Sequence, residues 1–480
     1  MSKLFKSLAA LILCATVLTA STRADHPNIV VIYVDDMGYG DLGCYGSEVN
    51  DTPHVDRLAA EGMKFTDFYS SSPVCTPARA SLMTGCYPGR VSFDGFGQGG
   101  RSWVLFPGFA EGLHPDERTL PELLKEQGYA TALIGKWHLG DQPEHLPTRH
   151  GFDLYYGVPY SNDMAIMPRR ANSPPMPLMR NERVIQEQPT QAALIERYTI
   201  EAAEFIHQNR EQPFFLLMSH LHVHLPHYVM DPFASESRND RYGAAVAAID
   251  WSTGVIMAEL KRAGLDDNTI VMFTSDNGSR TRNEGGSNAP LRGHKGQVWE
   301  GGMRVPFIVR WPEAVPAGSE SSELSTIMDL YPTLANLVGH DVTTLPKHDG
   351  GDVMPLWRGD ENAVSPYDHF FYYIRNELRA VRDQRWKLHH NKEDDDESVE
   401  LFDLANDIAE SRCVADDHPD VVERLMAAME EMRQQLGDSR FGIEGTERRP
   451  AGRVDNPRPL TEFDPDYPYI EPSYLLNEAG

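Results

Sequence analysis

The sequence is poor in cysteine, in positive charge and in long apolar stretches. Five of its 480 residues are cysteine, well below the density of a disulfide-stapled scaffold. Its 44 lysine and arginine residues are outnumbered by 71 acidic residues, which gives a formal net charge of −27. A field of that sign repels nucleic acid and anionic membranes, so neither is expected as a partner. Beyond residue 24, no segment is long and apolar enough to suggest a membrane span.

The first 24 residues differ from the rest of the chain. Lys3 and Lys6 precede an apolar run over residues 8–18, and small residues follow up to Ala20 and Ala24. A basic start, a short apolar core and small residues before a cleavage point are typical of a secretory signal peptide. We therefore predict a signal peptide over residues 1–24 and an exported protein, either periplasmic or secreted.

Short apolar runs alternate with amphipathic helical patterns over residues 25–365. This alternation predicts an α/β domain with a large, mostly parallel central sheet flanked by helices on both faces. Polar residues follow each run, and ligands of open α/β sheets bind beyond the carboxyl ends of the strands, so these residues are expected to share one site. The apolar runs cover residues 28–34, 131–134, 214–218 and 270–274; the helical patterns cover residues 52–62, 120–127, 190–208 and 242–262.

Two further regions have their own composition. Residues 161–190 are rich in Pro, Arg, Asn and Met and are predicted to form a loop at the rim of the site. From residue 366, short strand patterns precede an amphipathic helical pattern at 421–436, which predicts a smaller α+β subdomain with an antiparallel sheet over residues 366–445. The Pro-rich, acidic tail at 446–480 is expected to wrap the surface or stay loose.

Two pairs of oxygen-bearing residues directly follow predicted strands. Asp35 and Asp36 follow the first strand, and Asp276 and Asn277 follow the run at 270–274. Three carboxylates and one amide are hard ligands that suit Ca²⁺, suit Mg²⁺ less well, and argue against zinc. One Asp-Asp pair alone would fit a turn or a helix cap. The second pair at a neighbouring strand end favours a metal site.

The segment Cys75-Thr-Pro-Ala-Arg79 is the most distinctive in the chain. Pro77 suits the first turn of a helix and Gly85 suits its end. Cys75 would then lie at a helix N-terminus, where free N–H groups and the helix dipole favour an anion. Taken alone, the pattern fits a buried or redox-active thiol as well as a catalytic residue.

Residues 72–85 resemble the signature of the sulfatase family, in which this cysteine is oxidised after synthesis to formylglycine. Residues 128–138, which include Lys136 and His138, are similar to the second signature of the same family. The resemblance extends over residues 27–340 and more weakly through residues 400–407. Segments 34–43 and 285–304 are similar to those of arylsulfatase A and N-acetylgalactosamine-6-sulfatase relatives, which belong to the alkaline-phosphatase-like superfamily.

The resemblance implies a sulfuric ester hydrolase that releases an alcohol and inorganic sulfate. In such enzymes one hydroxyl of the formylglycine hydrate attacks sulfur with the help of Ca²⁺, and deprotonation of the other expels sulfate. A formylglycine-generating maturation enzyme is then an expected partner. Conversion of Cys75 would leave three cysteines in the exported chain, enough for one disulfide of unknown pairing, among Cys44, Cys86 and Cys413.

The same resemblance implies a role for each residue of the site. One Ca²⁺ is expected to bind Asp35, Asp36, residue 75, Asp276 and Asn277. Arg79 is expected to hold the formylglycine and metal side, Lys136 and Lys295 to bind sulfate oxygens, His138 to act as the base, and His224 to act as the leaving-group acid. His224 lies two residues before Pro226, the family's spacing, with His222 as the alternative acid.

Some assignments stay open. His220, His222, His224 and His227 would also fit a transition-metal site, although no acidic or cysteine partner lies near them in the sequence. Ser161 fits a loop cap better than a sulfate contact. His294 stands where relatives often have a small residue or a cysteine. Solvated side chains are expected, ahead of glycan contacts, for Arg169, Arg170, Arg180 and Arg183.

The expected substrates are sulfated carbohydrates of the galactose or N-acetylgalactosamine 6-sulfate type, or aryl sulfates. Two other function classes remain. A phosphonate or phosphodiester hydrolase built on the same formylglycine site would prefer a phosphorus ester to an aryl sulfate. A glycan-binding protein without activity would bind a glycan without turnover, although the full set of site residues argues against this class.

Overall fold

The structure is a computed structural model that describes residues 26–167, 170–393 and 396–461. The predicted signal peptide, Arg169 and the end of the predicted tail lie outside the described residues. Among those residues, Cys44, Cys75, Cys86 and Cys413 are all free thiols, so none of these four forms the disulfide that the sequence allows.

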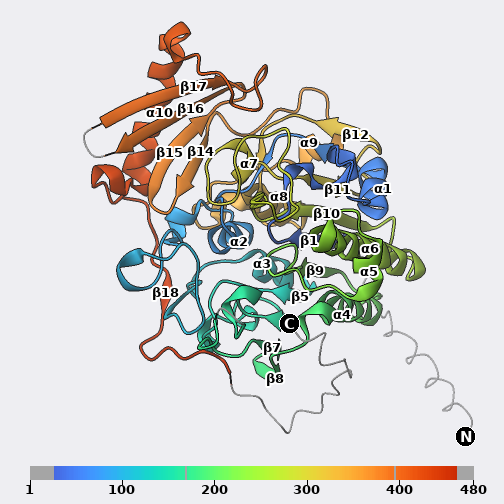
Figure 1. Cartoon of the computed structure of the whole chain (residues 1–480). Coiled ribbons are helices and arrows are strands. Elements are labelled where there is room, and N and C mark those ends of the chain that lie inside the picture. Colours follow the sequence, from blue (N-terminus) through green and yellow to red (C-terminus); the bar gives the residue numbers. More distant parts are fainter. Residues whose placement is uncertain (1–25, 168–169, 394–395, 462–480) are drawn as a thin grey trace, which may run out of the picture.

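A ten-stranded mixed sheet forms the centre of the molecule (Figure 1). Strands β10, β1, β9, β5 and β6 lie side by side and are parallel, whereas β11 and β7 run antiparallel to their neighbours on either side. This confirms the predicted fold class. The strand order is β12 (Ser319–Ser321), β2 (Met63–Phe65), β11 (Phe307–Arg310), β10 (Thr269–Ser275), β1 (Asn28–Val34), β9 (Phe214–Ser219), β5 (Ala130–Lys136), β6 (Leu154–Val158), β7 (Pro177–Arg180) and β8 (Arg183–Glu187).

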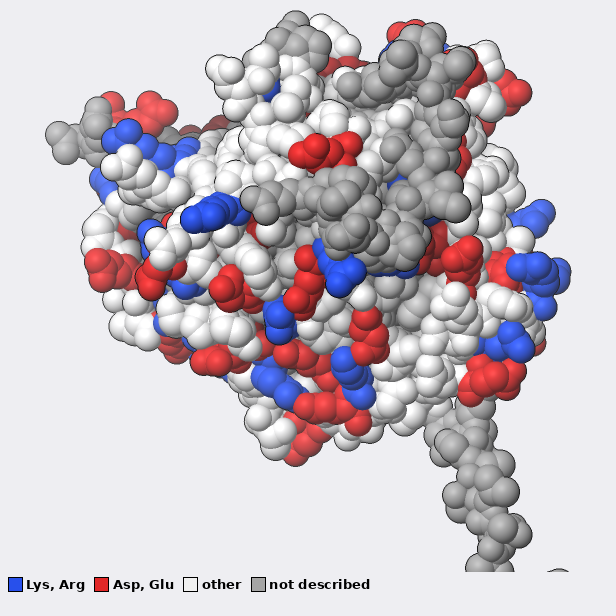
Figure 2. Space-filling model, turned by 90° about the horizontal axis from the view of Figure 1, so that it is seen from below, with Lys and Arg blue, Asp and Glu red and all other residues white. Residues whose placement is uncertain are grey.

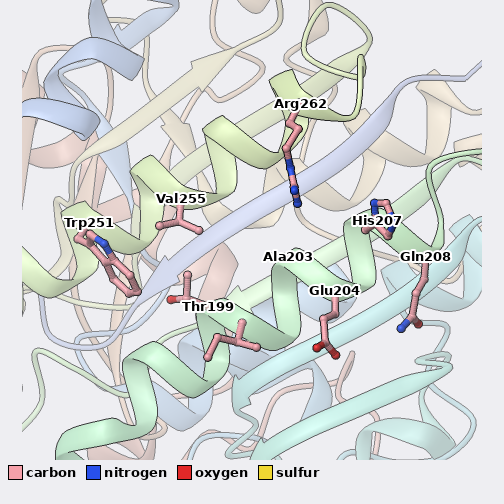
Figure 3. Close-up of a pocket in the computed structure, with 9 residues that line it drawn as sticks. Thr199, Ala203, Glu204, His207, Gln208, Trp251, Val255 and Arg262 are labelled. Carbon is pink, nitrogen blue, oxygen red and sulfur yellow. The ribbon is translucent and has the colours of Figure 1, made fainter.

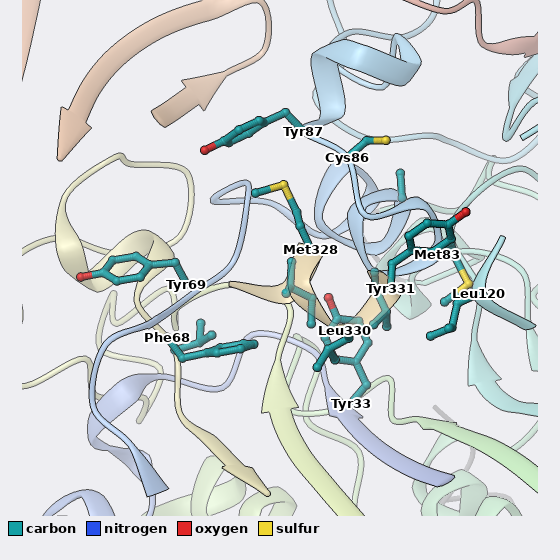
Figure 4. Close-up of a cluster of buried hydrophobic side chains, with 14 of the residues drawn as sticks. Tyr33, Phe68, Tyr69, Met83, Cys86, Tyr87, Leu120, Met328, Leu330 and Tyr331 are labelled. Atoms are coloured by element: carbon teal, nitrogen blue, oxygen red, sulfur yellow. The ribbon is translucent and has the colours of Figure 1, made fainter. Parts of the chain in front are cut away.

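Both faces of the sheet are buried under helices. On β1, Ile29 and Val31 belong to one hydrophobic cluster, while Val30 and Ile32 belong to the other. A strand that is buried on both faces needs apolar residues at every position, which is why its sequence is a continuous apolar run. The first cluster, part of which is drawn in Figure 4, includes α2 (Cys75–Thr84), α3 (Leu120–Glu126) and α8 (Leu330–Leu337). The second includes α1 (Pro53–Glu61), α4 (Leu194–Gln208) and α6 (Asp240–Arg262).

Helix α6 is long and apolar enough, by length and composition, to cross a membrane, which the sequence reading did not expect. Its 23 residues contain an 18-residue window of mean hydropathy 1.2, and 67% of that window is buried inside the protein. The helix packs against α4, α1 and the short α5 (Asp231–Glu236). We therefore interpret α6 as a core helix, whose apolar residues serve the second hydrophobic cluster.

A separate four-stranded antiparallel sheet follows in the C-terminal region, as the sequence predicts (orange and red in Figure 1). Helix α10 (Pro419–Leu436) packs against two of its strands. The sheet consists of β14 (Phe370–Ile374), β15 (Glu377–Arg382), β16 (Trp386–Glu393) and β17 (Asp396–Asp403). The short α7 (Glu300–Met303) and α9 (Met354–Arg358) and the strand pair β3 (Phe68–Tyr69) and β13 (Ser325–Thr326) lie in the chain before it.

Two segments behave differently from a simple loop or tail. The predicted loop at 161–190 contains β7 and β8, which form a hairpin that extends the edge of the central sheet. In the described part of the tail, β18 (Gly452–Arg453) pairs with β4 (Glu111–Gly112), so this part wraps the α/β domain. On the face shown in Figure 2, basic side chains are interspersed among acidic ones and do not gather into a basic area.

Candidate active site

The polar residues predicted to share a site follow β10, β1, β9 and β5, which are neighbours in the sheet. Val34 and Ser275 are paired in register, so Asp35 and Asp276 leave the sheet together. Gly135 and Ser219 are paired in the same way, which places Lys136 beside the end of β9. The parallel alignment of these strands therefore brings four distant segments to one edge of the sheet.

Cys75 is the first residue of α2, which reaches the same edge of the sheet. The helix ends at Thr84, and Gly85 adopts the left-handed conformation (φ 69°) that its sequence position predicts. The Cys75 Sγ and one oxygen each of Asp35 and Asp276 all lie within 4.8 Å of one another, and all three residues are buried. In the described part of the chain, this is the one group of three or more such side chains with converging ligand atoms. The histidines of the 220–227 segment form no such group.

Asp36 and Asn277 complete the oxygen-rich cluster. The amide nitrogen of Asn277 donates to Asp36 Oδ1 at 2.7 Å, and the backbone N–H of Asp36 donates to Asp276 Oδ1 at 3.1 Å. Two buried oxygens, Asp35 Oδ1 and Asn277 Oδ1, have no hydrogen-bond partner among the described residues. Buried polar atoms are seldom left unpaired, and these two belong to residues that the sequence assigned to a metal.

Three cations surround the carboxylates. Arg79 donates to a single oxygen of Asp276, Oδ2, from Nη2 at 2.8 Å and from Nε at 3.1 Å. Lys136 Nζ forms a buried ion pair with Asp35, and Lys295 Nζ lies 2.7 Å from Asp36 Oδ1. The three carboxylates and three cations balance in formal charge, so a bound divalent cation would make this pocket positive and attractive to a sulfate group.

The pKa values of the buried carboxyl groups reflect this crowding. Burial, with the nearby Asp35 carboxylate, raises the pKa of Asp276 to about 7. Burial alone would also raise the pKa of Asp35, but Lys136 and the other cations outweigh it and hold that pKa well below its usual range. Burial raises the pKa of the Cys75 thiol. Hard oxygen ligands, two of them unpaired, and a carboxyl group that resists ionisation together fit a hard divalent cation such as Ca²⁺.

His138 lies two residues beyond the end of β5 and is fully buried. Its Nε2 is 3.0 Å from the carbonyl oxygen of Leu105, which can only accept, so Nε2 carries the proton. Its Nδ1 has no partner among the described residues and keeps a lone pair. Burial, followed by the charge of Lys136, lowers the pKa of His138 well below its usual value. The ring is therefore a neutral imidazole with one nitrogen available to accept a proton.

The side chain of His224 reaches the cluster, whereas His222 meets it through its backbone carbonyl oxygen, which accepts from the Asp35 N–H at 3.2 Å. His224 Nδ1 lies 2.6 Å from the Leu225 carbonyl oxygen, and its Nε2 lies 3.7 Å from Asp36 Oδ2. His222 is buried with both ring nitrogens unpartnered among the described residues, and burial lowers its pKa to about 3. The geometry favours His224 among the two residues that the sequence left open.

Two serines also belong to the site. The sequence predicted another role for Ser161 and did not single out Ser219. Ser161 makes no capping hydrogen bond; its Oγ lies 3.4 Å from Lys136 Nζ and 3.5 Å from His224 Nδ1. The expectation of a loop cap is therefore wrong for its side chain. Ser219 Oγ accepts from Arg79 Nη1 at 2.7 Å and donates to the Lys136 carbonyl oxygen at 2.7 Å. Its position at the end of an apolar strand is the sequence feature that could have identified it.

Other predicted residues lie outside the cluster. Arg180 is bound to Glu201 in a bidentate ion pair, with distances of 2.7 and 2.5 Å, so it is not a solvated side chain. Arg170 Nη2 lies 3.9 Å from Asp163 Oδ2. His294 Nδ1 lies 2.8 Å from the carbonyl oxygen of Lys295. His294 therefore shapes the backbone at the lysine.

A surface groove of about 530 Å³ lies between α4 and α6 (Figure 3). Trp251, Val255 and Arg262 line it from α6, and His207 lines it from α4. None of the predicted site residues is among its lining residues, so this groove is a separate feature of the two helices.

Comparison with known proteins agrees with this arrangement. The sulfatase family model matches residues 27–340, and the model named "N-sulphoglucosamine sulphohydrolase, C-terminal" matches residues 294–435. The first match covers well over half of the chain, including every residue of the cluster. The chain belongs to the sulfatase family, and it is a sulfuric ester hydrolase.

Individual relatives point to more than one substrate class. N-acetylgalactosamine-6-sulfatase of Canis lupus familiaris is 39% identical over 393 residues, covering 79% of this chain and 74% of that protein. Steryl-sulfatase of Mus musculus is 37% identical over 451 residues, covering 78% and 72%. A solved structure of Ps i-CgsB in complex with k-i-k-neocarrahexaose superimposes with a TM-score of 0.74 at 29% identity, covering 88% of this chain and 95% of that one.

Proposed function

We propose that this sulfatase removes a 6-sulfate from galactose or N-acetylgalactosamine units of a sulfated glycan, with formylglycine at position 75 and one Ca²⁺. The observation that carries the proposal is the meeting of Cys75 with two carboxylates and, around them, three cations at one edge of the sheet. A relative named N-acetylgalactosamine-6-sulfatase and a neighbour solved with an oligosaccharide support the glycan class.

The donor set supports an assignment of ligands for the metal. Asp35, Asp36, Asp276 and Asn277 would hold Ca²⁺, with residue 75 facing them, and the ion would supply positive charge against the sulfate and the attacking oxygen. Oxidation of Cys75 to formylglycine would supply a hydrated aldehyde with two hydroxyl groups, one to accept the sulfuryl group and one to expel it. An ordinary serine or cysteine ester would instead have to be hydrolysed.

The chain's own side chains then divide the remaining work. Lys136 and Lys295 bind the sulfate oxygens, where charge builds up in the transition state. Arg79 holds Asp276 in place through its two hydrogen bonds to Oδ2. His138 accepts a proton at Nδ1, the nitrogen that its bond to Leu105 leaves free. His224, protonated on both nitrogens and holding its Nδ1–H on the Leu225 carbonyl oxygen, donates a proton to the departing alcohol from Nε2, which faces the cluster beside Asp36.

Substrate class is tested by sulfate release from a matched set of esters. The set contains galactose 6-sulfate and N-acetylgalactosamine 6-sulfate disaccharides, an N-acetylgalactosamine 4-sulfate disaccharide, a steroid sulfate, and aryl sulfate and aryl phosphonate pairs. The 6-sulfated sugars are expected to have the highest kcat/KM, and aryl sulfate to exceed aryl phosphonate. A higher kcat/KM for the steroid or for the phosphonate contradicts the proposal.

The metal assignment has a readout that does not depend on turnover. After removal of divalent ions by a chelator, Ca²⁺ at about 100 times its Kd should raise the free energy of unfolding by about 2.7 kcal/mol. Mg²⁺ should raise it less, and Zn²⁺ should not substitute. Thermal unfolding with each ion measures this order, and greater stabilisation by Zn²⁺ contradicts a hard-oxygen site.

We also propose that the protein is exported, on the basis of its first 24 residues. Fusion of these residues to a reporter that is active only outside the cytoplasm tests this. Reporter activity that disappears when Lys3 and Lys6 are replaced by glutamate supports export, and a fusion that stays inactive contradicts it.

A further inference from the structure

Trp103 and Arg375 form a second, smaller arrangement beside Gly296, the residue that follows Lys295. We propose that these two side chains form a subsite for an anionic group, sulfate or carboxylate, on the sugar unit next to the one that carries the scissile sulfate. The inference rests on the proposed function and deepens it, because it selects a multiply charged oligosaccharide over a steroid or a simple aryl ester.

Trp103 is exposed although it is large and apolar. Its exposed fraction is 36%, and it is the one aromatic among the exposed large hydrophobic side chains of the described residues. Two residues further along the chain, Leu105 contacts two parts of the site. Its carbonyl oxygen accepts from His138 Nε2, and its N–H donates to Thr76 Oγ1 at 3.3 Å. The segment 103–105 thus runs from the protein surface to the catalytic base and the start of α2.

Trp103 packs against the residue that follows Lys295. Gly296 has a φ of 82°, and a Cβ placed on it would lie 3.1 Å from Trp103 Cζ3, so the indole packs directly on this glycine. The N–H of Gly296 donates to the carbonyl oxygen of Pro73 at 2.9 Å, two residues before Cys75. Trp103 therefore contacts the residue next to Lys295, the predicted sulfate-binding lysine. That same residue is hydrogen-bonded to Pro73, which lies two positions before Cys75 in the sequence.

Arg375 comes from the other part of the molecule, at the turn between β14 and β15. Its guanidinium carbon lies 4.9 Å from the centre of the Trp103 ring. The turn is anchored, since the carbonyl oxygen of Asn376 accepts from Ser439 N at 2.7 Å. Arg375 has a φ of 54°, a backbone conformation that suits glycine or asparagine better than arginine. The C-terminal sheet thus delivers a cation to the rim of the α/β domain.

Arg375 differs from its neighbours in having no acidic partner in the described part of the chain. Arg379, in the same hairpin, is paired with Glu377, and Arg385 is paired with Asp403 at 2.7 Å. Arg292 also lies over a tryptophan, but its Nη1 donates to the Glu410 carbonyl oxygen. In a chain with an excess of acidic residues, an unpaired guanidinium on an exposed indole keeps its donors available to a ligand.

The chemistry of the pair selects the ligand. A guanidinium binds sulfate or carboxylate through two parallel N–H donors, and the indole gives an apolar surface on which a sugar ring packs. The net charge of −27 repels a polyanion at long range, so a multiply charged glycan needs local cations beyond those at the scissile sulfate. A steroid sulfate or aryl sulfate carries one anionic group and would leave Arg375 unused.

The test compares two substrates across four variants. The substrates are a small aryl monosulfate and a 6-sulfated disaccharide whose neighbouring unit carries a second sulfate or a carboxylate. Arg375→Gln should lower kcat/KM for the disaccharide by about 10- to 100-fold, the range for losing a charge-assisted hydrogen bond, and leave the aryl sulfate unchanged. Trp103→Ala should act in the same direction by about 5- to 10-fold.

Two variants guard against a folding effect. Arg375→Gly suits the left-handed backbone and should reproduce the disaccharide loss with unchanged thermal unfolding. Arg379→Gln removes a paired arginine from the same hairpin and should leave both substrates unchanged. Equal losses on both substrates, or no loss on the disaccharide for Arg375→Gln and Arg375→Gly, overturn the subsite.

The outcomes also separate the subsite from the proposed function. If the wild type hydrolyses the disaccharide and the Arg375 variants do so equally well, the subsite is refuted and the glycan function stands. A wild-type protein that hydrolyses aryl or steroid sulfates but no charged disaccharide refutes the glycan function, and the subsite with it.

Discussion

Two buried ionic clusters of similar size lie in this fold, and they differ in how completely they are paired. The strand-end cluster contains Arg79, Lys136 and Lys295 with Asp35, Asp36 and Asp276. The boundary cluster lies where the C-terminal sheet meets the α/β domain and contains Glu300, Arg304, Arg382, Lys387 and Glu410.

The boundary cluster is saturated with partners. Glu300 accepts from Lys387 at 2.9 Å, from the Tyr372 hydroxyl at 2.8 Å, and from Tyr69 and Arg304 on its other oxygen. Glu410 accepts from the Glu300 N–H at 2.7 Å and from His389 at 2.9 Å. Every carboxylate oxygen here has a donor, which is the condition under which buried charge is tolerated.

The strand-end cluster leaves polar atoms without partners. Asp35 Oδ1, Asn277 Oδ1 and His138 Nδ1 are buried and have no hydrogen bond within the described residues. In the boundary cluster, saturation fits a role in holding the structure together; in the strand-end cluster, unsatisfied atoms beside converging carboxylates and Cys75 fit a site that meets a ligand. Four predictions test this contrast, from the largest expected effect to the smallest.

Cys75→Ala should abolish turnover with little change in stability. Removal of a catalytic nucleophile costs on the order of 10⁴-fold or more in kcat. Sulfate release and thermal unfolding, measured on the same preparation, check both halves of this prediction. An alanine variant that keeps more than a tenth of the wild-type turnover would refute the assignment of residue 75 as the nucleophile.

Lys295→Ala should lower kcat/KM by about 10²- to 10³-fold, because it removes one cation from the developing charge on sulfate. Lys64→Ala is a suitable control, since Lys64 pairs with Glu320 on the surface, away from the site. Steady-state kinetics with an aryl sulfate measure the effect. An equal fall in kcat/KM for Lys295→Ala and Lys64→Ala would contradict a specific role for Lys295 at the sulfate.

Lys387→Met should lower the free energy of unfolding and leave turnover unchanged, the reverse of the Lys295 variant. Breaking a buried ion pair by removing one partner costs about 3–5 kcal/mol in the free energy of unfolding. The fraction that remains folded should keep its kcat, since Lys387 contacts Glu300 and Glu410 and not the strand-end cluster. Denaturant unfolding and active-site titration separate these two quantities. A folded variant that has lost turnover would contradict a purely structural boundary cluster.

The smallest effect is the pH dependence of Glu300→Gln. Burial alone would raise the pKa of Glu300, but Lys387 and the two arginines outweigh it and hold that pKa far below its usual value of 4.5. A lowered carboxyl pKa stabilises the fold above about pH 4.5, and this contribution fades as the pH falls toward the folded-state pKa. The stability difference between wild type and variant should therefore be constant from pH 5 to 8, on the order of 3 kcal/mol, and shrink in acid. A difference that grows as the pH falls has the wrong sign.

The sequence predicted the parts of this molecule that depend on local pattern. The bounds of β1 agree residue for residue, because a strand buried on both faces is apolar throughout. The hairpin β7–β8 was missed, because prolines and polar residues hid a strand pair that forms at the sheet edge. The domain boundaries at 365 and 445 stay predictions.

The site followed the same rule. Residues at strand ends were predicted as a group, and the structure brings Asp35, Cys75 and Asp276 together. Ser161 and the Trp103–Arg375 pair depend on contacts between segments that are far apart in the sequence. No local pattern specifies such contacts, which is why sequence reasoning gave the first a capping role and did not identify the second.

The central claim is that residue 75 acts as an oxidised cysteine beside a divalent cation, and mass spectrometry of the tryptic peptide 65–79 tests it most directly. The protein is purified from its secreting host with the maturation enzyme present, and sulfate release is measured on the same sample. We predict the mass change expected when –CH₂SH becomes –CHO, in proportion to the active fraction. An unmodified thiol in a fully active preparation would contradict the account.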